Sequence, residues 1–250
     1  MDEVEYRKMF ELEDGHWWFR VKRAIVASMI DRYAARPTGT ARRRILDVGC
    51  GTGANLRALE RYGEAFGGDV HPLALRLCRE RGLRNLARAD AARLPFADAQ
   101  MDVVVALDVL YHRRVVDPAA ALREIHRVCR AEALLVITDS ALAWLAGPHD
   151  VAFHGARRFG RRELAAAVER AGFAVLKASY MNTLLFPLAA PARLLERLRF
   201  GGERAHSSVE PTSRLVNAFL ERVYRAEAAL LRRMDLPIGL SVLLVARKAA

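Results

Sequence analysis

The stretch ILDVGCGTGANL, residues 45–56, decides the fold. Its apolar first half is typical of a buried strand, and Gly49, Gly51 and Gly53 separate that strand from a helical pattern. A glycine-rich turn at this place lets the backbone approach a ligand closely, with its N–H groups facing inward. The sequence therefore predicts a ligand-binding loop between a strand and a helix.

The spacing around this loop indicates which ligand binds. The glycines follow a G-x-G-x-G pattern, whereas dinucleotide sites use G-x-G-x-x-G. Asp47 lies two residues before the first glycine, where its carboxylate would repel a pyrophosphate and attract a cationic amine. These features favour a ligand with an ammonium group and an adenosine, and a Rossmann dehydrogenase is the alternative.

Short apolar segments alternate with helical ones from residue 43 to residue 180. This alternation predicts parallel βαβ units with helices on both faces of the sheet, and continuous runs such as VVVAL fit strands buried on both sides. The expected strands are RRILDV (43–48), EAFGGD (64–69), NLARAD (85–90), MDVVVALD (101–108), ALLVITD (133–139) and FAVLKASY (173–180).

The two ends of the chain depart from this rhythm. Residues 181–234 are helical in pattern but are interrupted by prolines and a glycine pair, and PIGLSVLLVARK (237–248) reads as a last strand. We predict a doubly wound α/β domain over residues 1–250 with a seven-stranded, mostly parallel sheet. Its parts are an N-terminal helical cap (1–40), a cofactor-binding core (41–180), a helical insertion (181–234) that is a lid or a dimer surface, and the final strand (235–250).

Two further carboxylates fall at strand ends. Asp69 follows the first glycine by about 20 residues, the position from which a carboxylate accepts ribose hydroxyls. Asp90 follows the third expected strand and is placed to accept from an exocyclic adenine amine. Open α/β folds bind their ligands at this carboxyl edge, so the three aspartates predict one site.

At this point the chain resembles class I S-adenosylmethionine-dependent methyltransferases. The resemblance rests on LDVGCGTG, GGDVHPLAL, ADAARLPFADAQMDVVVALDVLYH and LREIHRVCRAEALLVITD, in this order over about residues 43–140. It implies that the cofactor is S-adenosylmethionine, with S-adenosylhomocysteine as product. It also implies that Asp47 and the glycine loop hold the methionine part, Asp69 the ribose, and Asp90 with the Ala91 backbone the adenine. Cys50, Val70 and Leu107 complete the expected cofactor contacts.

The N-terminal stretch EDGHWWFRVKR, residues 13–23, carries an aromatic cluster followed by basic residues. Its HWWF motif resembles a group of bacterial methyltransferases of natural-product or cell-surface glycan pathways, in which arginine usually stands where Lys22 stands here. In the resembling fold such a helix covers the cofactor edge. Trp18 then shields the sulfonium, and Arg20, Lys22 or Arg23 meets the cofactor carboxylate. Packing on the core is the alternative.

Methyl transfer to an oxygen or nitrogen nucleophile needs alignment and, for a hydroxyl or ammonium acceptor, a base. The candidate catalytic residues are His112 and His149, which follow the fourth and fifth expected strands. His112, His149, His154 and Arg158 are candidate contacts for a small-molecule acceptor, which an arginine would favour as an anion. The sequence holds no metal-ligand or Ser–His–Asp pattern.

Bulk composition narrows the remaining classes of protein. The three scattered cysteines (Cys50, Cys78 and Cys129) and the absence of an apolar leader or spanning segment predict a cytoplasmic protein. The formal charge of +11 favours anionic partners in general. A nucleic-acid-associated protein, an inactive cofactor-binding partner subunit, and peripheral membrane contact through residues 181–234 remain as alternatives, with no nucleic-acid binding expected.

Overall fold

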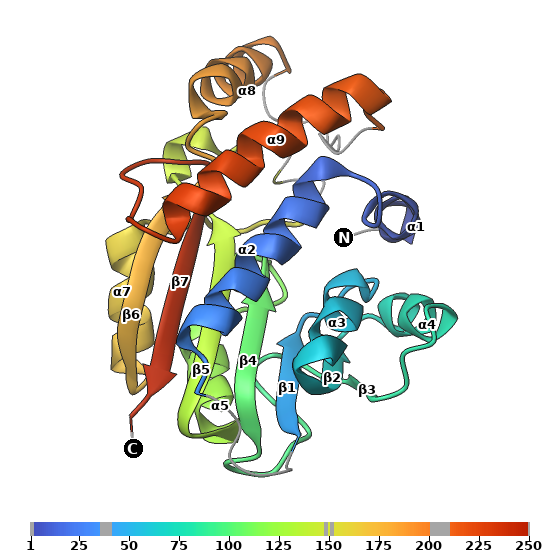
Figure 1. Ribbon diagram of the computed structural model, residues 1–250, viewed down its shortest axis with the longest axis vertical. Coiled ribbons are helices and arrows are strands. Elements are labelled where there is room, and N and C mark those ends of the chain that lie inside the picture. The colour runs from blue at the N-terminus through green and yellow to red at the C-terminus, as the bar shows by residue number, and fades with distance from the viewer. Residues whose placement is uncertain (1–2, 36–41, 148–149, 151–152, 201–210, 250) are drawn as a thin grey trace.

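A computed structural model describes residues 3–35, 42–147, 150, 153–200 and 211–249, and the side chains of 196–200 are left out of the description. Its centre is a seven-stranded sheet in the order β3-β2-β1-β4-β5-β7-β6 (Figure 1). All neighbours are parallel except β7, which is antiparallel to both β5 and β6. The strands are β1 Arg43–Val48, β2 Gly63–Asp69, β3 Leu86–Arg88, β4 Met101–Leu107, β5 Cys129–Ser140, β6 Phe173–Met181 and β7 Ser241–Lys248.

The strands are apolar because both faces of the sheet are covered. In β4, Val104 packs in one core, while Val103 and Val105 pack in the core on the opposite face. All three valines are fully buried, as expected for a parallel sheet flanked by helices. The prediction of a doubly wound, mostly parallel sheet is confirmed.

Helices cover the two faces unequally. Helices α5 Pro118–Val128 and α7 Arg161–Arg170 pack in the first core. Buried side chains of α2 Trp17–Tyr33, α3 Ala54–Leu59, α4 Pro72–Glu80 and α9 Arg214–Leu231 belong to the second. Two short 3-10 helices, η1 Glu60–Tyr62 and η2 Ala143–Leu145, complete the connections around the sheet.

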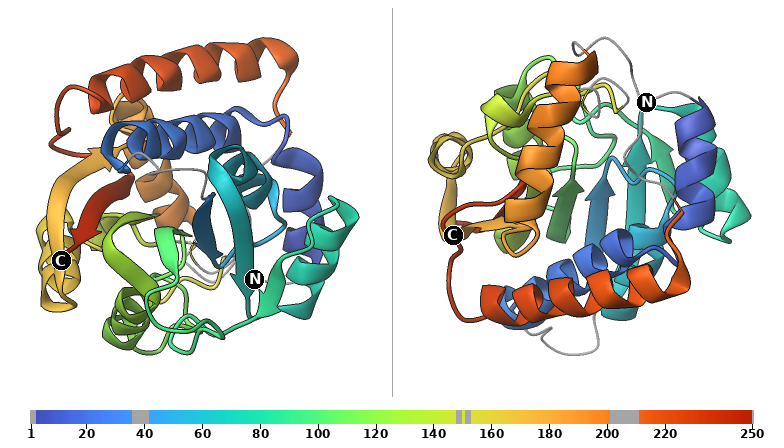
Figure 2. Two further views of the ribbon diagram at one scale, coloured as in Figure 1. Left: turned by 60° about the horizontal axis from the view of Figure 1, so that its bottom comes forward. Right: turned by 90° about the horizontal axis from the view of Figure 1, so that it is seen from above.

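The N-terminal cap consists of two helices, α1 Glu3–Leu12 and α2. They separate at residues 13–16, where His16 caps α2 by accepting a hydrogen bond from the Trp18 backbone N–H at 3.3 Å. Helix α1 packs on α4, whereas α2 lies along α9 (Figures 1 and 2). The aromatic cluster therefore sits at the start of α2 and faces the C-terminal helices.

The segment before the last strand holds α8 Phe186–Phe200 and α9. Helix α8 lies above the carboxyl ends of the central strands (Figure 1), and α9 runs beside α2 (Figure 2, right). Buried Glu227 of α9 accepts backbone hydrogen bonds from Asn182 and, at 2.9 Å, from Leu184. This carboxylate fastens the turn between β6 and α8 to α9.

Among the described residues, no helix is long and apolar enough to cross a membrane.

Candidate active site

The glycine loop has the backbone that only glycine adopts readily. Gly49 and Gly51 have φ values of +70° and +54°, in the left-handed region. A Cβ on Gly49 would lie 2.6 Å from a Val109 methyl group, so the loop admits no side chain there. The loop thus presents a bare backbone at the carboxyl end of β1. Gly53 has a different position, since it caps α3 and packs on Leu83 and Cys78.

Asp47 is a buried carboxylate beneath this loop. Its side chain accepts a hydrogen bond from Asn55 Nδ2 at 3.0 Å, and the residue is 2% exposed. Burial raises the pKa of Asp47 to about 7, although the Asn55 hydrogen bond opposes the shift. A cationic group placed beside it would restore the charged form and would itself be stabilised.

Asp69 ends β2 and braces the loop. Its two oxygens accept from the backbone N–H groups of Gly51 at 3.0 Å and His71 at 2.8 Å. Burial raises the pKa of Asp69, and these two hydrogen bonds oppose the shift. A carboxylate has about four acceptor positions, so it retains capacity for ligand hydroxyls. Asp90 is exposed at its backbone turn and accepts from Ala92 N at 2.8 Å.

A cavity of 840 Å³ extends from these carboxylates to the C-terminal helices. A pocket of this size is near the upper end of the range for small-molecule sites. The sequence-predicted residues that line it come from both the N-terminal cap and the sheet edge: Trp18, Lys22, Arg23, Asp47, Gly49, Cys50, Gly51, Asp69, Val70, Asp90, Ala91, Leu107 and His112.

The basic residues of α2 have different surroundings. Lys22 is buried, forms an ion pair with Asp108 at the end of β4, and lies 5.2 Å from the centre of a Trp18 ring. Arg20 does not line the cavity, because it pairs with Glu221 of α9 at 3.1 Å and is largely exposed. The structure thus separates Lys22 and Arg20, which the sequence treated as equivalent.

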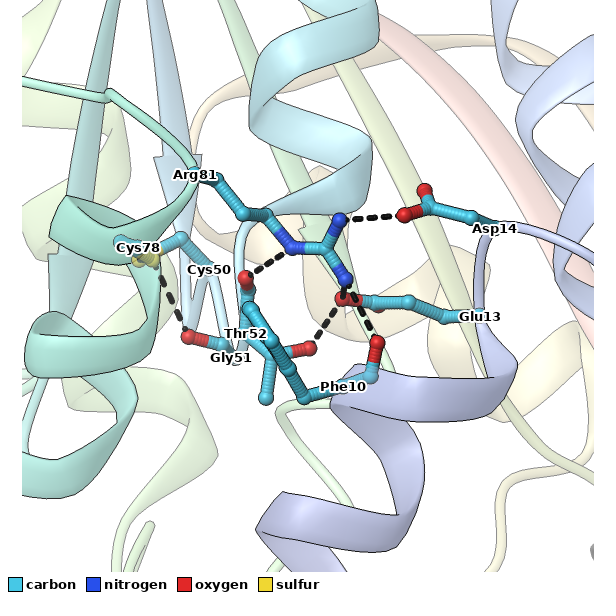
Figure 3. A network of polar contacts seen from close by, with 8 residues as sticks. All are labelled: Phe10, Glu13, Asp14, Cys50, Gly51, Thr52, Cys78 and Arg81. Carbon is cyan, nitrogen blue, oxygen red and sulfur yellow. Dashed lines mark hydrogen bonds and ion pairs between the residues drawn. The ribbon is translucent and has the colours of Figure 1, made fainter.

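A polar network joins α1 to the glycine loop (Figure 3). Thr52 Oγ1 donates to Glu13, and the Arg81 guanidinium donates to Glu13 Oε1 at 2.9 Å and to the Thr52 carbonyl at 2.8 Å. Arg81 also reaches Asp14 Oδ2 at 2.5 Å and the Phe10 carbonyl at 2.8 Å. Arg81 and Glu13 lie far apart in the sequence without a shared motif, which is why sequence reasoning missed this network.

His112 is half buried beside the cavity. Its Nδ1 accepts a hydrogen bond from the Arg114 backbone N–H at 3.1 Å, so in the neutral ring the proton resides on Nε2. Burial lowers the pKa of His112 to about 4, with a further contribution from positive charge on His154 and Arg114. A neutral ring of this tautomer is a weak base and a good hydrogen-bond donor.

Two further predicted acceptor contacts, Arg158 and His154, do not line the cavity. Arg158 is buried and makes a two-pronged ion pair with Asp150, at 3.0 and 2.9 Å, besides donating to the Ala141 carbonyl. Its guanidinium is therefore used within the fold. His154 does not line the cavity, although its ring centre lies 5.8 Å from that of His112. His149 lies outside the described residues.

A comparison with protein-family models supports the geometry. A family described as a methyltransferase domain matches residues 46–137, which begin in β1 and end in β5. The chain carries a class I S-adenosylmethionine-dependent methyltransferase domain. The matched range contains the glycine loop, Asp47, Asp69 and Asp90, and the helical cap and insertion lie outside it.

Curated relatives match parts of this methyltransferase. A tRNA U34 carboxymethyltransferase from Cronobacter sakazakii is 38% identical over 92 residues, which are 34% of this chain and 28% of that protein. A demethylmenaquinone methyltransferase from Mycobacterium marinum is 37% identical over 115 residues, covering 44% and 48% of the two chains. The matched segment of the chain therefore spans less than half the length of either relative.

A solved structure shows the same fold over nearly the whole chain. An S-adenosylmethionine-dependent methyltransferase from Thermotoga maritima superposes with a TM-score of 0.59 at 18% identity, covering 98% of this chain and 95% of that one. At this identity the likeness concerns the fold, including the elements outside the family match.

The residues present fit the cofactor that this family uses. The glycine loop is a cradle that a Cβ would fill, and the buried Asp47 carboxylate suits an ammonium group. Asp69 and Asp90 supply acceptors for hydroxyl and amine groups. Within the described part of the chain, no cluster of three metal-ligating side chains occurs.

Proposed function

We propose that this protein transfers a methyl group from S-adenosylmethionine to an oxygen or nitrogen nucleophile of a small molecule, of natural-product or glycan type, by direct displacement. The observation that carries the proposal is the buried Asp47 beneath the glycine loop, where Gly49 leaves no room for a side chain, at one end of a cavity with room beyond it. When bound, the cofactor supplies an electrophilic methyl group on a sulfonium.

The residues of the chain have two roles in this reaction: they bind the cofactor and they align the reacting groups. Asp47 would hold the ammonium group of the cofactor, Asp69 the ribose hydroxyls, and Asp90 with Ala91 the adenine. Lys22 lines the cavity and, with Asp108 as its fixed partner, would meet the cofactor carboxylate. Trp17 and Trp18 line the same cavity and exclude water from the reacting atoms.

His112 acts in this scheme as a hydrogen-bond donor to the acceptor. Its Nδ1 is occupied by a backbone N–H, and its lowered pKa makes it a weak base. A donor that fixes the orientation of the nucleophile contributes through alignment. Deprotonation of the acceptor then falls to solvent or to the acceptor's own ionisation, and this suits nucleophiles that are already uncharged amines or acidic hydroxyls.

Calorimetry with S-adenosylhomocysteine tests the proposal directly. We expect one site per chain with a Kd in the micromolar range, and an affinity loss of at least 10-fold in Asp47→Asn, since hydrogen bonds to charged groups contribute about 1.5–3 kcal/mol. Asp31→Asn, an exposed aspartate on α2, is the matched control. Failure to bind at millimolar ligand contradicts the proposal.

A second arm of the experiment separates acceptor classes. The formal charge of +11, and the tRNA-modifying activity named for one relative, motivate a titration with a transfer RNA probe. We expect no specific shift at 150 mM salt. Tight RNA binding with a steep salt dependence would favour a nucleic-acid acceptor instead.

A further inference from the structure

We propose that the acceptor of this methyltransferase carries an aliphatic chain, which lies along α8 and leaves the cavity between α8 and α9. This inference rests on the proposed function, because it describes the second substrate of the same cavity. It assigns a chemical class, an amphiphile with one polar reactive end, and it assigns the surface that holds the apolar end.

The two ends of the cavity differ in chemistry. The end at the sheet has the buried aspartates and the exposed backbone of the glycine loop. The end formed by α8 and α9 is apolar, and Arg193 is the single charged residue that the described parts of these two helices contribute to the lining. The apolar lining residues from α8, the turn before it and α9 are Leu185, Leu188, Ala189, Ala192 and Leu220.

The apolar surface continues along α8 to the outside of the protein. Leu188 and Leu195 of α8 are 76% and 55% exposed. Together with Ala192 they follow each other at intervals of four and three residues, which places them on one face of the helix. Leu188 both lines the cavity and is exposed, so it marks the rim where the inner and outer surfaces meet.

Helix α9 supplies the opposite side. Leu220 lines the cavity, and Val216, one turn earlier on the same helix, is 48% exposed. The adjacent Phe219 is 63% exposed. Viewed from above, α8 and α9 stand on two sides of the space over the strand ends (Figure 2, right). Large apolar side chains exposed in a contiguous stripe mark a ligand groove or a contact surface.

Continuity with the cavity favours a ligand chain over a separate contact surface. The stripe meets, at Leu188, an interior lined with leucine and alanine, so an apolar chain can follow both surfaces. The polar groups at the sheet end of the cavity suit the cofactor. The cavity volume of 840 Å³ leaves room for a second ligand beside it. Each methylene that follows this path leaves water for an apolar surface.

The test uses a homologous series of 4-n-alkylphenols, from methyl to octyl, titrated into the full-length protein saturated with S-adenosylhomocysteine. We expect the Kd to fall roughly threefold for each added methylene, because burying one contributes about 0.8 kcal/mol at most. Leu188→Glu should flatten this dependence to less than twofold per methylene. Leu194→Glu is the matched control, being an exposed leucine of α8 that does not line the cavity, and should keep the wild-type dependence.

The outcomes distinguish the inference from the function on which it rests. If S-adenosylhomocysteine binds but the alkyl series is flat, the inference is wrong and the proposed function stands. If S-adenosylhomocysteine does not bind, the proposed function itself fails. Equal losses in Leu188→Glu and Leu194→Glu also overturn the inference.

A vesicle experiment addresses the membrane alternative. Co-sedimentation with phosphatidylcholine vesicles containing phosphatidylglycerol should show no binding that depends on Leu188. Strong vesicle binding that is lost in Leu188→Glu, together with a flat alkylphenol series, would show that the stripe is a membrane-contact face and would overturn the assignment of a substrate chain.

Discussion

Trp18 of α2 stacks on Tyr224 of α9, with ring centres 5.5 Å apart and planes 8° from parallel. Tyr224 is fully buried, and Trp17 meets the same ring edge-on at 5.7 Å. Trp17 and Trp18 of the N-terminal cap therefore form a surface on which α9 of the C-terminal insertion packs. Because Trp18 also lines the cavity beside Lys22, α9 packs directly on a residue of the cavity wall.

A double-mutant cycle measures this contact. Trp18→Leu and Tyr224→Leu should each lower the free energy of unfolding, and their coupling energy should be about 0.5–1.5 kcal/mol, the contribution of a stacked aromatic pair beyond burial. Urea unfolding followed by circular dichroism provides the four values. The combination of Trp18→Leu with Phe66→Leu, on the other core, should be additive. Additivity of the Trp18 and Tyr224 changes would contradict the prediction.

Lys22 and Arg20 provide a matched comparison on one helix. Lys22→Met removes a buried cation from the cavity and leaves Asp108 without its ion-pair partner, so affinity for S-adenosylhomocysteine should fall about 10-fold or more. Arg20→Met, which removes an exposed ion pair with Glu221, should change it less than threefold. Calorimetry checks both values, and a larger effect at Arg20 would show that the cofactor carboxylate is held elsewhere.

Because of Asp47, we expect cofactor binding to be coupled to the release of a proton. Its pKa, raised to about 7 by burial, means that the folded protein holds a proton there at pH 6.5 which a bound ammonium group would displace. Binding of S-adenosylhomocysteine should release roughly half a proton or more at pH 6.5 and much less at pH 8. Calorimetry in two buffers of different ionisation enthalpy measures this number. Asp47→Asn should bind weakly and without this release.

Asp47 also makes the free energy of unfolding of the ligand-free protein depend on pH, in the direction expected for a carboxyl group with a raised pKa. The stabilisation that comes from protonated Asp47 is fully present below about pH 4 and is lost as the pH rises through about 7. Unfolding of Asp47→Asn, compared with wild type at pH 5 and pH 8, should therefore show a smaller fall toward high pH.

His112 makes the free energy of unfolding depend on pH in the opposite direction. Its folded pKa of about 4 lies below the ordinary value, so the unfolded chain binds a proton more readily between about pH 6.5 and pH 4. Wild-type stability should thus decline on acidification through this window, and His112→Gln should decline less. Urea unfolding at pH 7 and pH 5 gives the comparison. Identical declines in the two proteins would show that His112 titrates normally.

Arg81 should control the attachment of α1 to the glycine loop. Its side chain and that of Glu13 are 4% and 8% exposed, so Arg81→Met leaves a buried carboxylate with Thr52 alone and should lower the free energy of unfolding by about 3 kcal/mol. Hydrogen exchange in Glu3–Leu12 should also accelerate. Arg79→Met, at an exposed position on the same helix, is the control. Unchanged exchange in α1 would mean that packing on α4 alone holds it.

The sheet and the floor of the site were predictable because they depend on local sequence. Apolar runs such as VVVAL become buried strands, and the left-handed turns at Gly49 and Gly51 need glycine at those positions. The aspartates that end β1 and β2 meet at one edge for the reason that all parallel strands end there. The final apolar run likewise predicted a last strand, and only the structure showed that β7 lies between β5 and β6.

The interaction partners of individual side chains could not be predicted from local sequence. The sequence position of Arg158 did not indicate that its guanidinium pairs with Asp150 inside the fold. The spacing of Arg20 and Lys22 did not indicate that they have different partners. Arg20 pairs with Glu221, and Lys22 pairs with Asp108. His112 was expected as a base, and the sequence did not reveal that its Nδ1 accepts from a backbone N–H or that burial lowers its pKa.

The sequence by itself determined the parallel sheet, the glycine loop and the row of carboxylates at its edge, since these follow from periodicity and backbone geometry within short segments. Only the tertiary structure decided which charges remain available to a ligand and which are used by the fold. The physical reason is that ion pairs and aromatic stacks form between residues far apart in the chain, where burial and distance set their partners. Trp18 on Tyr224 and Arg81 on Glu13 are contacts of this kind.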